Sequence, residues 1–506
     1  MGKINGLSKF RKPLACLPGL LLLSLGIYLV IDRLHVGFII NRIHEDIELR
    51  EGTDNYIAFL KIKVFFRVWL FEVTNPEAVM AGENPLLKEV GPFVYDLHIK
   101  NHINRIDEAS DEINFTVTKT YYFNQQESGD LSEDTVVTVL NFAYLGTIKK
   151  IISLAATFLK KIGPIIHQIF PGAVNPFLTG KAGDIIFSGL PLDCVNVDKA
   201  LNMICNVLKG NPPALLKKTD TPGLFKYSLF YRVNGTHQGP FTVNRGVKNI
   251  YSLGNTTSFK NMKVTNFWAT DTCNAVSGTN AITWPPMSKK LPKVQSYEAQ
   301  LCRSLSPSFT REVVLNTLAG YRYELTADTW NQEEMECYCP RNKKKVMECL
   351  PLGLMDIEKC QEVPIIFSEP HFLHASSELL DYAQGLHPIH EKHATFVVIE
   401  PFTGVPLSGS KKIQLNMKMS SIPTVPWLTN VTDGYFPILW AEEASVSTIE
   451  QMKSVINSHR LLNICSFLSW PPLFMGIWLI MKACLIDNQM YYQITYPRYP
   501  RGVAFQ

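Results

Sequence analysis

Two long apolar segments, one near each end of the chain, constrain how this 506-residue protein can fold. Leu14–Ile31 contains eighteen residues without a charge, and Leu461–Met481 contains twenty-one. A helix rises about 1.5 Å per residue, so either segment approaches the ~30 Å thickness of the hydrocarbon core of a bilayer. We therefore predict two membrane-spanning helices, and we expect Pro471-Pro472 to kink the second.

The residues around the first segment favour an uncleaved anchor over a cleaved signal peptide. A signal peptide has an apolar core of about 7–15 residues that ends at a small-residue cleavage site. Here the apolar run is longer, and Asp32 and Arg33 follow it. Four basic residues lie between Lys3 and Lys12, and by the positive-inside rule they place the N-terminus in the cytoplasm. A second span returns the C-terminus to the same side.

The predicted organisation therefore has five parts. They are a cytoplasmic N-terminus (1–13), a first span (14–31), an extracellular domain (32–460), a second span (461–481) and a cytoplasmic tail (482–506). This describes a two-span protein of the cell membrane, with the endolysosomal membrane as the alternative location. The net charge of +4 is small and spread out, so nothing indicates a nucleic-acid partner.

Glycosylation sequons and cysteines fit an extracellular or lumenal domain. The Asn-x-Ser/Thr sequons all lie between the two spans, at Asn114, Asn234, Asn255 and Asn430. Eight of the eleven cysteines lie there too, and an even number suits disulfide formation in an oxidising compartment.

The cysteines from Cys337 to Cys360 raise a choice between zinc and disulfides. In the cytosol, Cys337, Cys339, Cys349 and Cys360 would be candidate zinc ligands, although the Cys-x-Cys spacing is tight for a tetrahedral site. Outside the cytosol, disulfides are the expected state. The pairing itself does not follow from the residues alone, because eight cysteines allow 105 arrangements.

Alternating patterns predict a β-rich core for the extracellular domain. Lys412–Met419 reads KIQLNMKM, with apolar side chains on one face and lysine or amide side chains on the other, which is typical of a half-buried strand. Phe115–Phe123 and Thr395–Glu400 are rich in β-branched and aromatic residues, which also favour strands.

Ile148–Phe170 differs, because it is apolar with two pairs of lysines. The pairs lie eleven residues apart, almost three helical turns, so they share one face of a helix that Gly163-Pro164 should break. These lysines are Lys149, Lys150, Lys160 and Lys161. One interpretation is a surface helix with a solvated basic stripe. The other is a basic, apolar-backed platform that attracts anionic amphiphiles.

The motifs of common enzymes are missing. The sequence has no Gly-x-Ser-x-Gly elbow, no phosphate-binding P-loop and no Gly-x-Gly-x-x-Gly fingerprint. His390–His393 (HEKH) resembles a zinc-protease helix but spaces its histidines at i, i+3 rather than i, i+4. We interpret this run, with His387, as a polar surface loop, and we predict no metal, no cofactor and no enzymatic activity. An ectoenzyme assembled from distant residues is the alternative.

Several blocks, in order along nearly the whole chain, resemble the class B scavenger receptor family. They include Phe71–Asp96 (FEVTNPEAVMAGENPLLKEVGPFVYD), Cys337–Pro340 (CYCP) and Gly385–Leu407 (GLHPIHEKHATFVVIEPFTGVPL). Asp184–Cys194 (DIIFSGLPLDC) is similar to the branch of insect sensory neuron membrane proteins. One departure is Glu369, which stands where the family usually has Leu.

The resemblance implies a fold and a disulfide pattern. The expected fold is α+β: a two-span hairpin whose β-rich, barrel-like ectodomain carries an apical helical bundle and encloses a hydrophobic tunnel. The implied disulfides are Cys273–Cys337, Cys302–Cys360, Cys339–Cys349 and Cys194–Cys205.

The resemblance also implies a function without bond chemistry. We expect a receptor or co-receptor that captures long-chain hydrophobic ligands, such as fatty acids or fatty-acid-derived pheromones. The helix with Lys149, Lys150, Lys160 and Lys161 matches the apical region where members of this family capture ligand, so these lysines are the expected capture site. The expected partners are odorant-carrier proteins, an odorant receptor complex and the membrane. The alternatives are a general lipid or lipoprotein scavenger receptor and a lysosomal sorting receptor, for which Tyr491–Ile494 (YYQI) fits a Tyr-x-x-apolar sorting pattern. Cys484 is a candidate palmitoylation site.

Overall fold

The computed structural model describes residues 5–31, 34–173, 175–195, 197–210, 212, 215–330, 336–339 and 347–495. The chain forms two compact units. Unit 1 contains both ends of the chain, up to Asp46 and from Ile449, and unit 2 contains Ile47–Thr448.

Unit 1 is helical. Its elements are α1 (Asn5–Ile31), α2 (Leu34–Ile47, whose last residue belongs to unit 2), α13 (Ile449–Leu468) and α14 (Trp470–Thr495). Pro471 and Pro472 lie in the first turn of α14, where a missing N–H breaks no helical hydrogen bond. One turn residue, Ser469, separates α13 from α14, and the kink stays a prediction.

The apolar character of unit 1 agrees in part with the predicted spans. Among the described residues, one helical stretch, Ile449–Leu485, is long and apolar enough to cross a membrane, and Cys16–Ile31 is a shorter apolar helix. The two-span topology and its boundaries stay predictions.

Helices α1 and α14 pack with their backbones in close contact, and glycines permit this approach. A Cβ atom on Gly26 would lie 2.4 Å from the Leu473 nitrogen, and one on Gly476 would lie 2.4 Å from the Leu23 nitrogen. Small residues at such crossings are a common means of association between apolar helices.

In the part of the chain that the structure describes, unit 2 is built on a sheet of twelve strands. They are β1 (Lys61–Val73), β2 (Leu87–Asp107), β3 (Glu112–Phe123), β9 (His237–Asn244), β10 (Thr256–Phe259), β13 (Ser308–Leu315), β14 (Leu318–Glu324), β15 (Met355–Asp356), β16 (Ile366–Ser368), β17 (Phe396–Ile399), β18 (Pro406–Met419) and β19 (Gly434–Val446). The main path runs β10-β9-β3-β2-β1-β19-β18-β17-β14-β13, with β16 also beside β18 and β15 beside β16. All these pairings are antiparallel.

The β-rich core is confirmed, and so are the three predicted strands: β18 contains the one predicted from alternation, and β3 and β17 coincide with the two predicted from β-branched and aromatic residues. The pairings leave β10 and β13 at the ends of the path. The barrel-like closure and the internal tunnel that the resemblance implies stay predictions.

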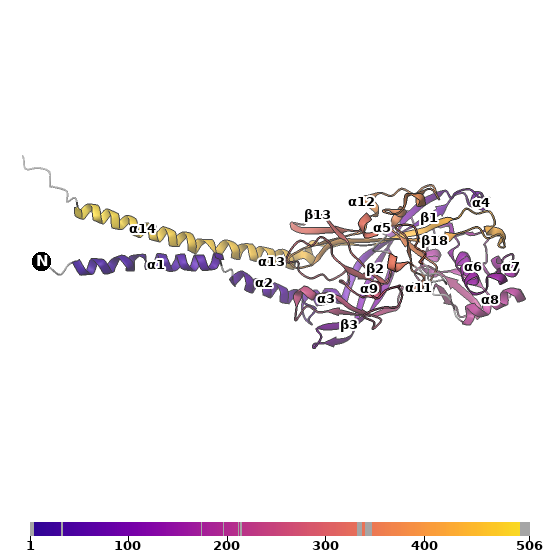
Figure 1. Cartoon of the computed structure of the whole chain (residues 1–506), viewed down its shortest axis with the longest axis horizontal. Coiled ribbons are helices and arrows are strands. Elements are labelled where there is room, and N and C mark those ends of the chain that lie inside the picture. Colours follow the sequence, from indigo (N-terminus) through magenta and orange to yellow (C-terminus); the bar gives the residue numbers. More distant parts are fainter. Residues whose placement is uncertain are drawn as a thin grey trace, which may run out of the picture. The chain divides into compact units, whose positions relative to one another are not determined.

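Short elements complete unit 2. The remaining strands are β4 (Val136–Leu140), β5 (Phe177–Lys181), β6 (Leu190–Asp193), β7 (Leu216–Lys218), β8 (Leu224–Tyr227), β11 (Ser296–Glu298) and β12 (Arg303–Leu305). The α-helices are α3 (Asp54–Leu60), α4 (Pro76–Met80), α5 (Gln125–Ser128), α6 (Phe142–Ala155), α7 (Leu159–Ile162), α8 (Lys199–Gly210), α9 (Asp271–Asn274), α11 (Glu358–Gln361) and α12 (His390–His393). Figure 1 shows α6, α7 and α8 gathered at one end of unit 2, away from α3.

The polar face of β18 corrects the prediction of a half-buried strand. Lys412, Gln414 and Asn416 are only 6%, 0% and 0% exposed, so both faces of the strand are covered. Neighbouring segments satisfy these polar side chains: Asn416 donates to the Ile366 carbonyl of the adjacent strand β16 at 3.1 Å, and Gln414 accepts from the His371 N–H, in the segment after β16, at 2.7 Å. Alternation located the two faces correctly, but it could not show that segments distant in sequence satisfy the polar one.

We predict that Gly26→Leu destabilises unit 1. The added side chain meets the backbone of α14, and such overpacking costs about 1–3 kcal/mol. The thermal midpoint of the full chain in detergent, followed by tryptophan fluorescence, should fall. Gly37→Leu is the matched control, since a Cβ at Gly37 in α2 has nothing within 4 Å. Equal midpoints for the two variants would show that the close contact of α1 and α14 does not support the unit.

Candidate functional site

The predicted basic helix lies in a helical lobe, which we define as α6, α7 and α8. The side chain of Asn141 caps α6 by accepting the Tyr144 N–H at 3.0 Å, so the helix starts earlier than predicted. A short 3-10 turn at Ala156–Phe158 separates α6 from α7, which ends before Gly163 as expected. A Cβ at Gly163 would lie 2.3 Å from the Thr424 carbonyl oxygen, so the close approach of that loop requires glycine there.

The four predicted lysines are all on this lobe, in two settings. Lys149 forms an ion pair with Glu358 of α11 at 2.8 Å, and both side chains are partly exposed. Lys150, Lys160 and Lys161 are exposed. Exposed apolar side chains lie on the same lobe: Ile152, Met203 and Val207. The lobe thus offers both positive charge and apolar surface to the solvent.

A pocket adjoins the ion pair of Lys149. Its volume is about 290 Å³, and its lining includes Trp268, Tyr338, Asp356 and Glu358. Trp268 and Tyr338 meet edge to face at 5.2 Å between ring centroids. The sequence prediction missed this pocket, because Trp268 and Tyr338 are separated by seventy positions and meet only in the folded chain.

The wall behind this pocket contains a buried arginine. The Arg303 guanidinium lies 3.7 Å from the centroid of the Tyr338 ring, a cation–π contact. Burial lowers the pKa of Arg303 to about 10, so it stays charged at neutral pH. A second cavity of about 40 Å³ is lined by Arg303, Trp268 and Trp330 among others.

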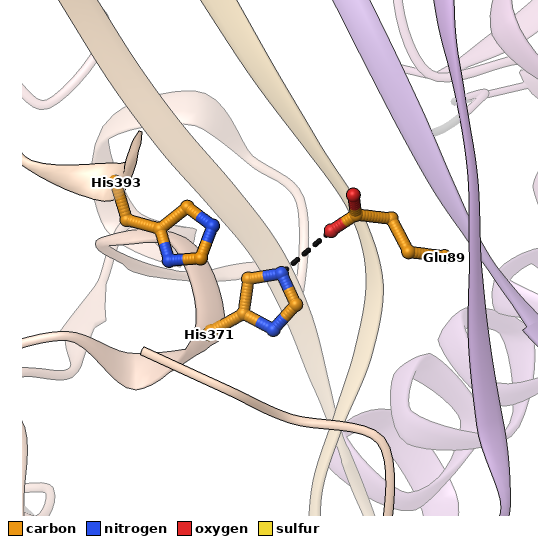
Figure 2. A group of neighbouring side chains, drawn as sticks. All are labelled: Glu89, His371 and His393. Atoms are coloured by element: carbon orange, nitrogen blue, oxygen red, sulfur yellow. Dashed lines mark hydrogen bonds and ion pairs between the residues drawn. The ribbon is translucent and has the colours of Figure 1, made fainter. Parts of the chain in front are cut away.

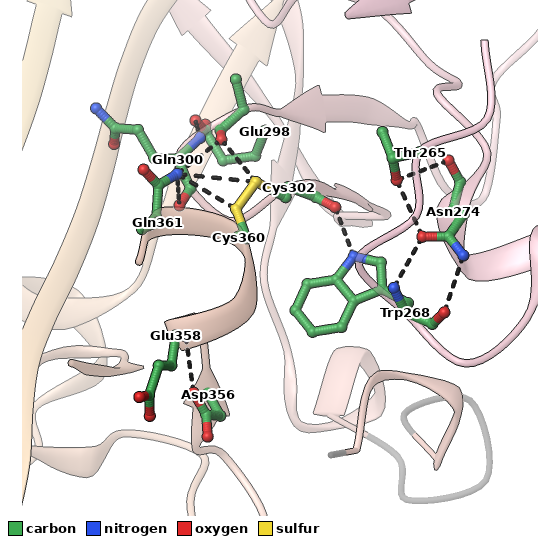
Figure 3. Close-up of a disulfide and its surroundings, with 11 residues drawn as sticks. Thr265, Trp268, Asn274, Glu298, Gln300, Cys302, Asp356, Glu358, Cys360 and Gln361 are labelled. Carbon is green, nitrogen blue, oxygen red and sulfur yellow. Dashed lines mark hydrogen bonds between the residues drawn. A yellow bond between two sulfur atoms is a disulfide. The ribbon is translucent and has the colours of Figure 1, made fainter. Parts of the chain in front are cut away.

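Disulfides fix the loops that form the pocket. The cysteines pair as Cys273–Cys337, Cys302–Cys360, Cys339–Cys349 and Cys194–Cys205, the same four pairs that the resemblance implies. Figure 3 shows Cys302–Cys360 joining α11 to the chain before β12, where Gln361 donates to the Gln300 carbonyl at 2.9 Å and Trp268 donates to the Cys302 carbonyl at 2.7 Å. Each disulfide also reduces the entropy of the unfolded chain, by roughly 2–4 kcal/mol in free energy.

One further group of side chains meets inside unit 2. Among the described residues, Glu89, His371 and His393 are the one set whose ligand atoms, one from each, lie within 4.8 Å of one another (Figure 2). His371 Nε2 contacts Glu89 Oε2 at 2.6 Å, and Trp440 Nε1 donates to the same oxygen at 3.0 Å. Burial alone would raise the pKa of Glu89, but these hydrogen bonds outweigh it and lower the pKa.

The orientation of the two histidines does not fit a metal ion. In each ring Nδ1 accepts a backbone N–H: from His387 to His371 at 3.1 Å, and from Ile389 to His393 at 3.0 Å. The neutral rings therefore carry their proton on Nε2. A metal ion bound at Nε2 would leave the ring proton on Nδ1, where it would face the backbone N–H that Nδ1 now accepts. Metal-binding histidines normally donate a hydrogen bond from the ring nitrogen that does not bind the metal, and here that nitrogen is an acceptor. The cluster is a hydrogen-bonded core, and we assign it no metal.

This cluster also corrects the interpretation of residues around His390 as a polar surface loop. His393 is only 3% exposed, and its ring stacks on that of His371 at 4.3 Å. His390 contacts Glu324 at 3.1 Å. The i, i+3 spacing excluded a zinc-protease helix but gave no sign that the run packs against a distant histidine.

The four sequons lie in different settings. Asn430 is exposed, whereas Asn114, Asn234 and Asn255 are half-buried. Asn114 lies within β3, and its Nδ2 donates to Thr242 Oγ1 at 2.9 Å. Asn234 accepts the Tyr121 N–H at 3.3 Å and leads into the turn at Gly235.

Comparison with known proteins decides the family. The model of the CD36 family matches residues 17–486. The chain belongs to the CD36 family. This confirms the class B scavenger receptor resemblance.

The chain is also similar to several insect proteins. It is 32% identical to sensory neuron membrane protein 2 of Manduca sexta over 475 residues, which covers 92% of this chain and 91% of the relative. It is 30% identical to sensory neuron membrane protein 1 of Apis mellifera over 444 residues, which covers 87% of this chain and 84% of the relative.

We predict that glycan occupancy follows the exposure of the sequons. Asn430 should be the most fully occupied, and Asn114 the least, because the nitrogen that would carry the glycan is bonded to Thr242 within the sheet. Glycopeptide mass spectrometry of the protein from insect cells measures this, with Asn430→Gln as the control for the assigned peptide. Full occupancy at Asn114 would contradict the strand placement of that residue.

Proposed function

We propose that this protein is a sensory membrane receptor or co-receptor for long-chain hydrophobic ligands. Fatty acids and fatty-acid-derived odorants or pheromones are the proposed ligand class. The helical lobe captures them, and they pass along unit 2 to the membrane or to a neighbouring odorant receptor. The protein binds and transfers, and it forms or breaks no bonds in the ligand.

One observation carries this proposal: the helical lobe of a CD36 family member exposes lysines and apolar side chains together. Lys150, Lys160 and Lys161 supply positive charge, and Ile152 and Met203 supply apolar contact. An anionic amphiphile binds best where positive charge and apolar surface lie together. Its head group is attracted to a cation, and its hydrocarbon chain is stabilised when it is removed from water. Each CH₂ group removed from water contributes about 0.8 kcal/mol.

The names of the relatives support a sensory setting. Proteins called sensory neuron membrane proteins match this chain over most of their length. A general lipid scavenger receptor or a sorting receptor would use the same surface. Expression of the protein in sensory neurons separates the proposed role from these alternatives.

We propose that Lys149 has a different role from the other three lysines. Its ion pair with Glu358 joins α6 to α11, at the edge of the 290 Å³ pocket. We infer that this pair opens when a carboxylate ligand competes for Lys149. Partly exposed ion pairs contribute only about 0–1 kcal/mol to stability, so a carboxylate ligand can displace Glu358 from Lys149 at little cost in free energy.

Replacing Lys150, Lys160 and Lys161 with Ala should weaken binding of a long-chain fatty acid roughly five- to tenfold, since each loses part of a charge–charge attraction. Binding of the matching neutral long-chain acetate should change less than twofold. Fluorescence displacement with the full chain in nanodiscs measures both affinities.

The control variant removes three positive charges, as the test variant does, but from surfaces outside the helical lobe. Lys100, Lys263 and Lys418 are exposed on other parts of unit 2, and their triple replacement with Ala should leave both affinities unchanged. Equal loss in the two triple variants would mean that net charge, and not the lobe, attracts the ligand. Unchanged binding in both would contradict capture by the lobe lysines.

A further inference from the structure

Two further histidines of unit 2 face each other, and each is held by a buried carboxylate. His374 lies in the segment after β16, and His390 is the first residue of α12. Their rings meet edge to face, with centroids 5.6 Å apart and planes inclined at 68°. Both side chains can be reached from solvent, because they are 16% and 42% exposed.

One nitrogen of each ring is bonded to a carboxylate. His374 Nδ1 lies 2.8 Å from Glu369 Oε2, and His390 Nε2 lies 3.1 Å from Glu324 Oε2. A carboxylate can only accept a hydrogen bond, so these two nitrogens carry the ring protons. In the neutral rings, Nε2 of His374 and Nδ1 of His390 therefore have a lone pair. Neither nitrogen has a hydrogen-bond partner among the described residues.

This arrangement is the reverse of the one in the cluster of Glu89, His371 and His393. There, Nδ1 of each histidine accepts a backbone N–H, and a bound metal would oppose that contact. Here, each ring donates to a carboxylate and leaves its other nitrogen open, which is the usual arrangement of histidines that bind metals. The carboxylate fixes the orientation of the ring and makes the open nitrogen a stronger ligand.

We propose that His374 and His390 form a binding site for a divalent transition metal, such as Zn²⁺ or Cu²⁺, with Glu369 and Glu324 as the supporting carboxylates. Imidazole nitrogen suits both ions. Two imidazoles that share a tetrahedral metal, at metal–nitrogen distances of about 2.0–2.1 Å, have ring centroids about 5 Å apart. The observed 5.6 Å is close to this, so binding requires only small rotations of the side chains.

The supporting carboxylates are themselves held in place. Trp330 Nε1 donates to Glu369 Oε2 at 3.0 Å, and Arg322 Nε donates to Glu324 Oε1. Both carboxylates are only 2% exposed. Burial of a carboxylate is costly unless hydrogen bonds and positive charge compensate it. Arg322 supplies that charge for Glu324.

Glu369 is less well compensated, and this is an independent indication of a cation. Its Oε1 is buried and has no hydrogen-bond partner among the described residues. The neighbouring Lys412 is paired with Glu442 at 3.6 Å. A metal on His374 would add positive charge beside this carboxylate. Glu369 also stands where the family usually has Leu, so the supporting carboxylate is a feature of this chain.

The proposed site has two protein ligands. The described residues offer no group of three ligand atoms here, so water molecules or an outside ligand would fill the other positions. The site involves no residue of the helical lobe and does not depend on the proposed ligand capture. It departs from our prediction of no metal. That prediction compared His390 with its neighbours in sequence, whereas its partner, His374, lies sixteen positions earlier.

Metal binding by the full chain tests the proposal. The chain is produced in detergent without a histidine tag and stripped with a chelator. Titration with Zn²⁺ against a fluorescent chelator should show one tight site per chain. With one equivalent of Cu²⁺, the electron paramagnetic resonance spectrum should show coupling to two imidazole nitrogens. A chain that takes up neither ion, or a spectrum without two imidazole nitrogens, would overturn the proposal.

Single substitutions locate the ion. His390→Ala, at a half-exposed position, should weaken Zn²⁺ binding at least about tenfold. His374→Asn should do the same, and Asn tolerates the left-handed backbone at this position, where φ is 57°. Glu369→Gln keeps an acceptor for Trp330 but removes the negative charge, and should weaken binding by about tenfold. Unchanged affinity in these variants would contradict the site.

A second pair of histidines, without carboxylates, is the matched control. The rings of His102 and His237 are 5.0 Å apart, but both contact Thr118 Oγ1, at 3.1 Å and 3.2 Å. Replacement of both with Asn should leave the Zn²⁺ affinity unchanged. If this control loses the site, or if it weakens binding as much as His390→Ala does, the ion is not held by His374 and His390 and the proposal is wrong.

Discussion

The pairing of β1 with β19 is the constraint on which the rest of unit 2 depends. It joins the first strand of the chain to the last, with Trp69 stacked on Trp440 at 3.7 Å and Arg67 paired with Glu442 at 2.9 Å. The sheet continues from this pair through β2, β3, β9 and β10 on one side and through β18, β17, β14 and β13 on the other. Contacts between residues so far apart in sequence form late and slowly, because the loop between them must first close.

Buried charges make this arrangement specific. Glu443 of β19 contacts Lys119 of β3 at 2.6 Å and Lys411 of β18 at 3.3 Å. Burial alone would raise the pKa of Glu443, but the two lysines lower it to about 2. Three strands must therefore come together for the carboxylate to be satisfied. Removal of either lysine would leave the half-buried carboxylate with one positive partner in place of two.

The candidate functional surfaces are formed by chain segments that connect strands of this sheet. The helical lobe lies between β3 and β9, and the disulfide-bonded loops around Trp268 and Tyr338 lie between β10 and β16. The ion pair of Lys149 with Glu358 connects the two insertions. The sheet thus supplies a fixed frame, while the exposed lysines and the pocket lie on parts that could vary in sequence without disturbing it.

Local patterns predicted the elements well and their surroundings less well. Alternation located β18, β-branched and aromatic residues located β3 and β17, and the lysine-rich apolar run located α6 and α7, because these patterns depend on neighbouring residues. The buried polar face of β18 and the cluster of Glu89, His371 and His393 could not be predicted. Their residues are up to three hundred positions apart and meet only through the register of the folded sheet. The cysteine pairs came from the family resemblance, since spacing alone left them open.

The proposed function requires that unit 2 binds long-chain hydrophobic molecules. Native mass spectrometry of a secreted form of residues 33–460 would show whether lipid remains bound after purification. We expect about one bound lipid per protein, displaced by added long-chain fatty acids or acetates. A protein that carries no lipid and binds none of these compounds would contradict it, and would leave a role in binding other proteins.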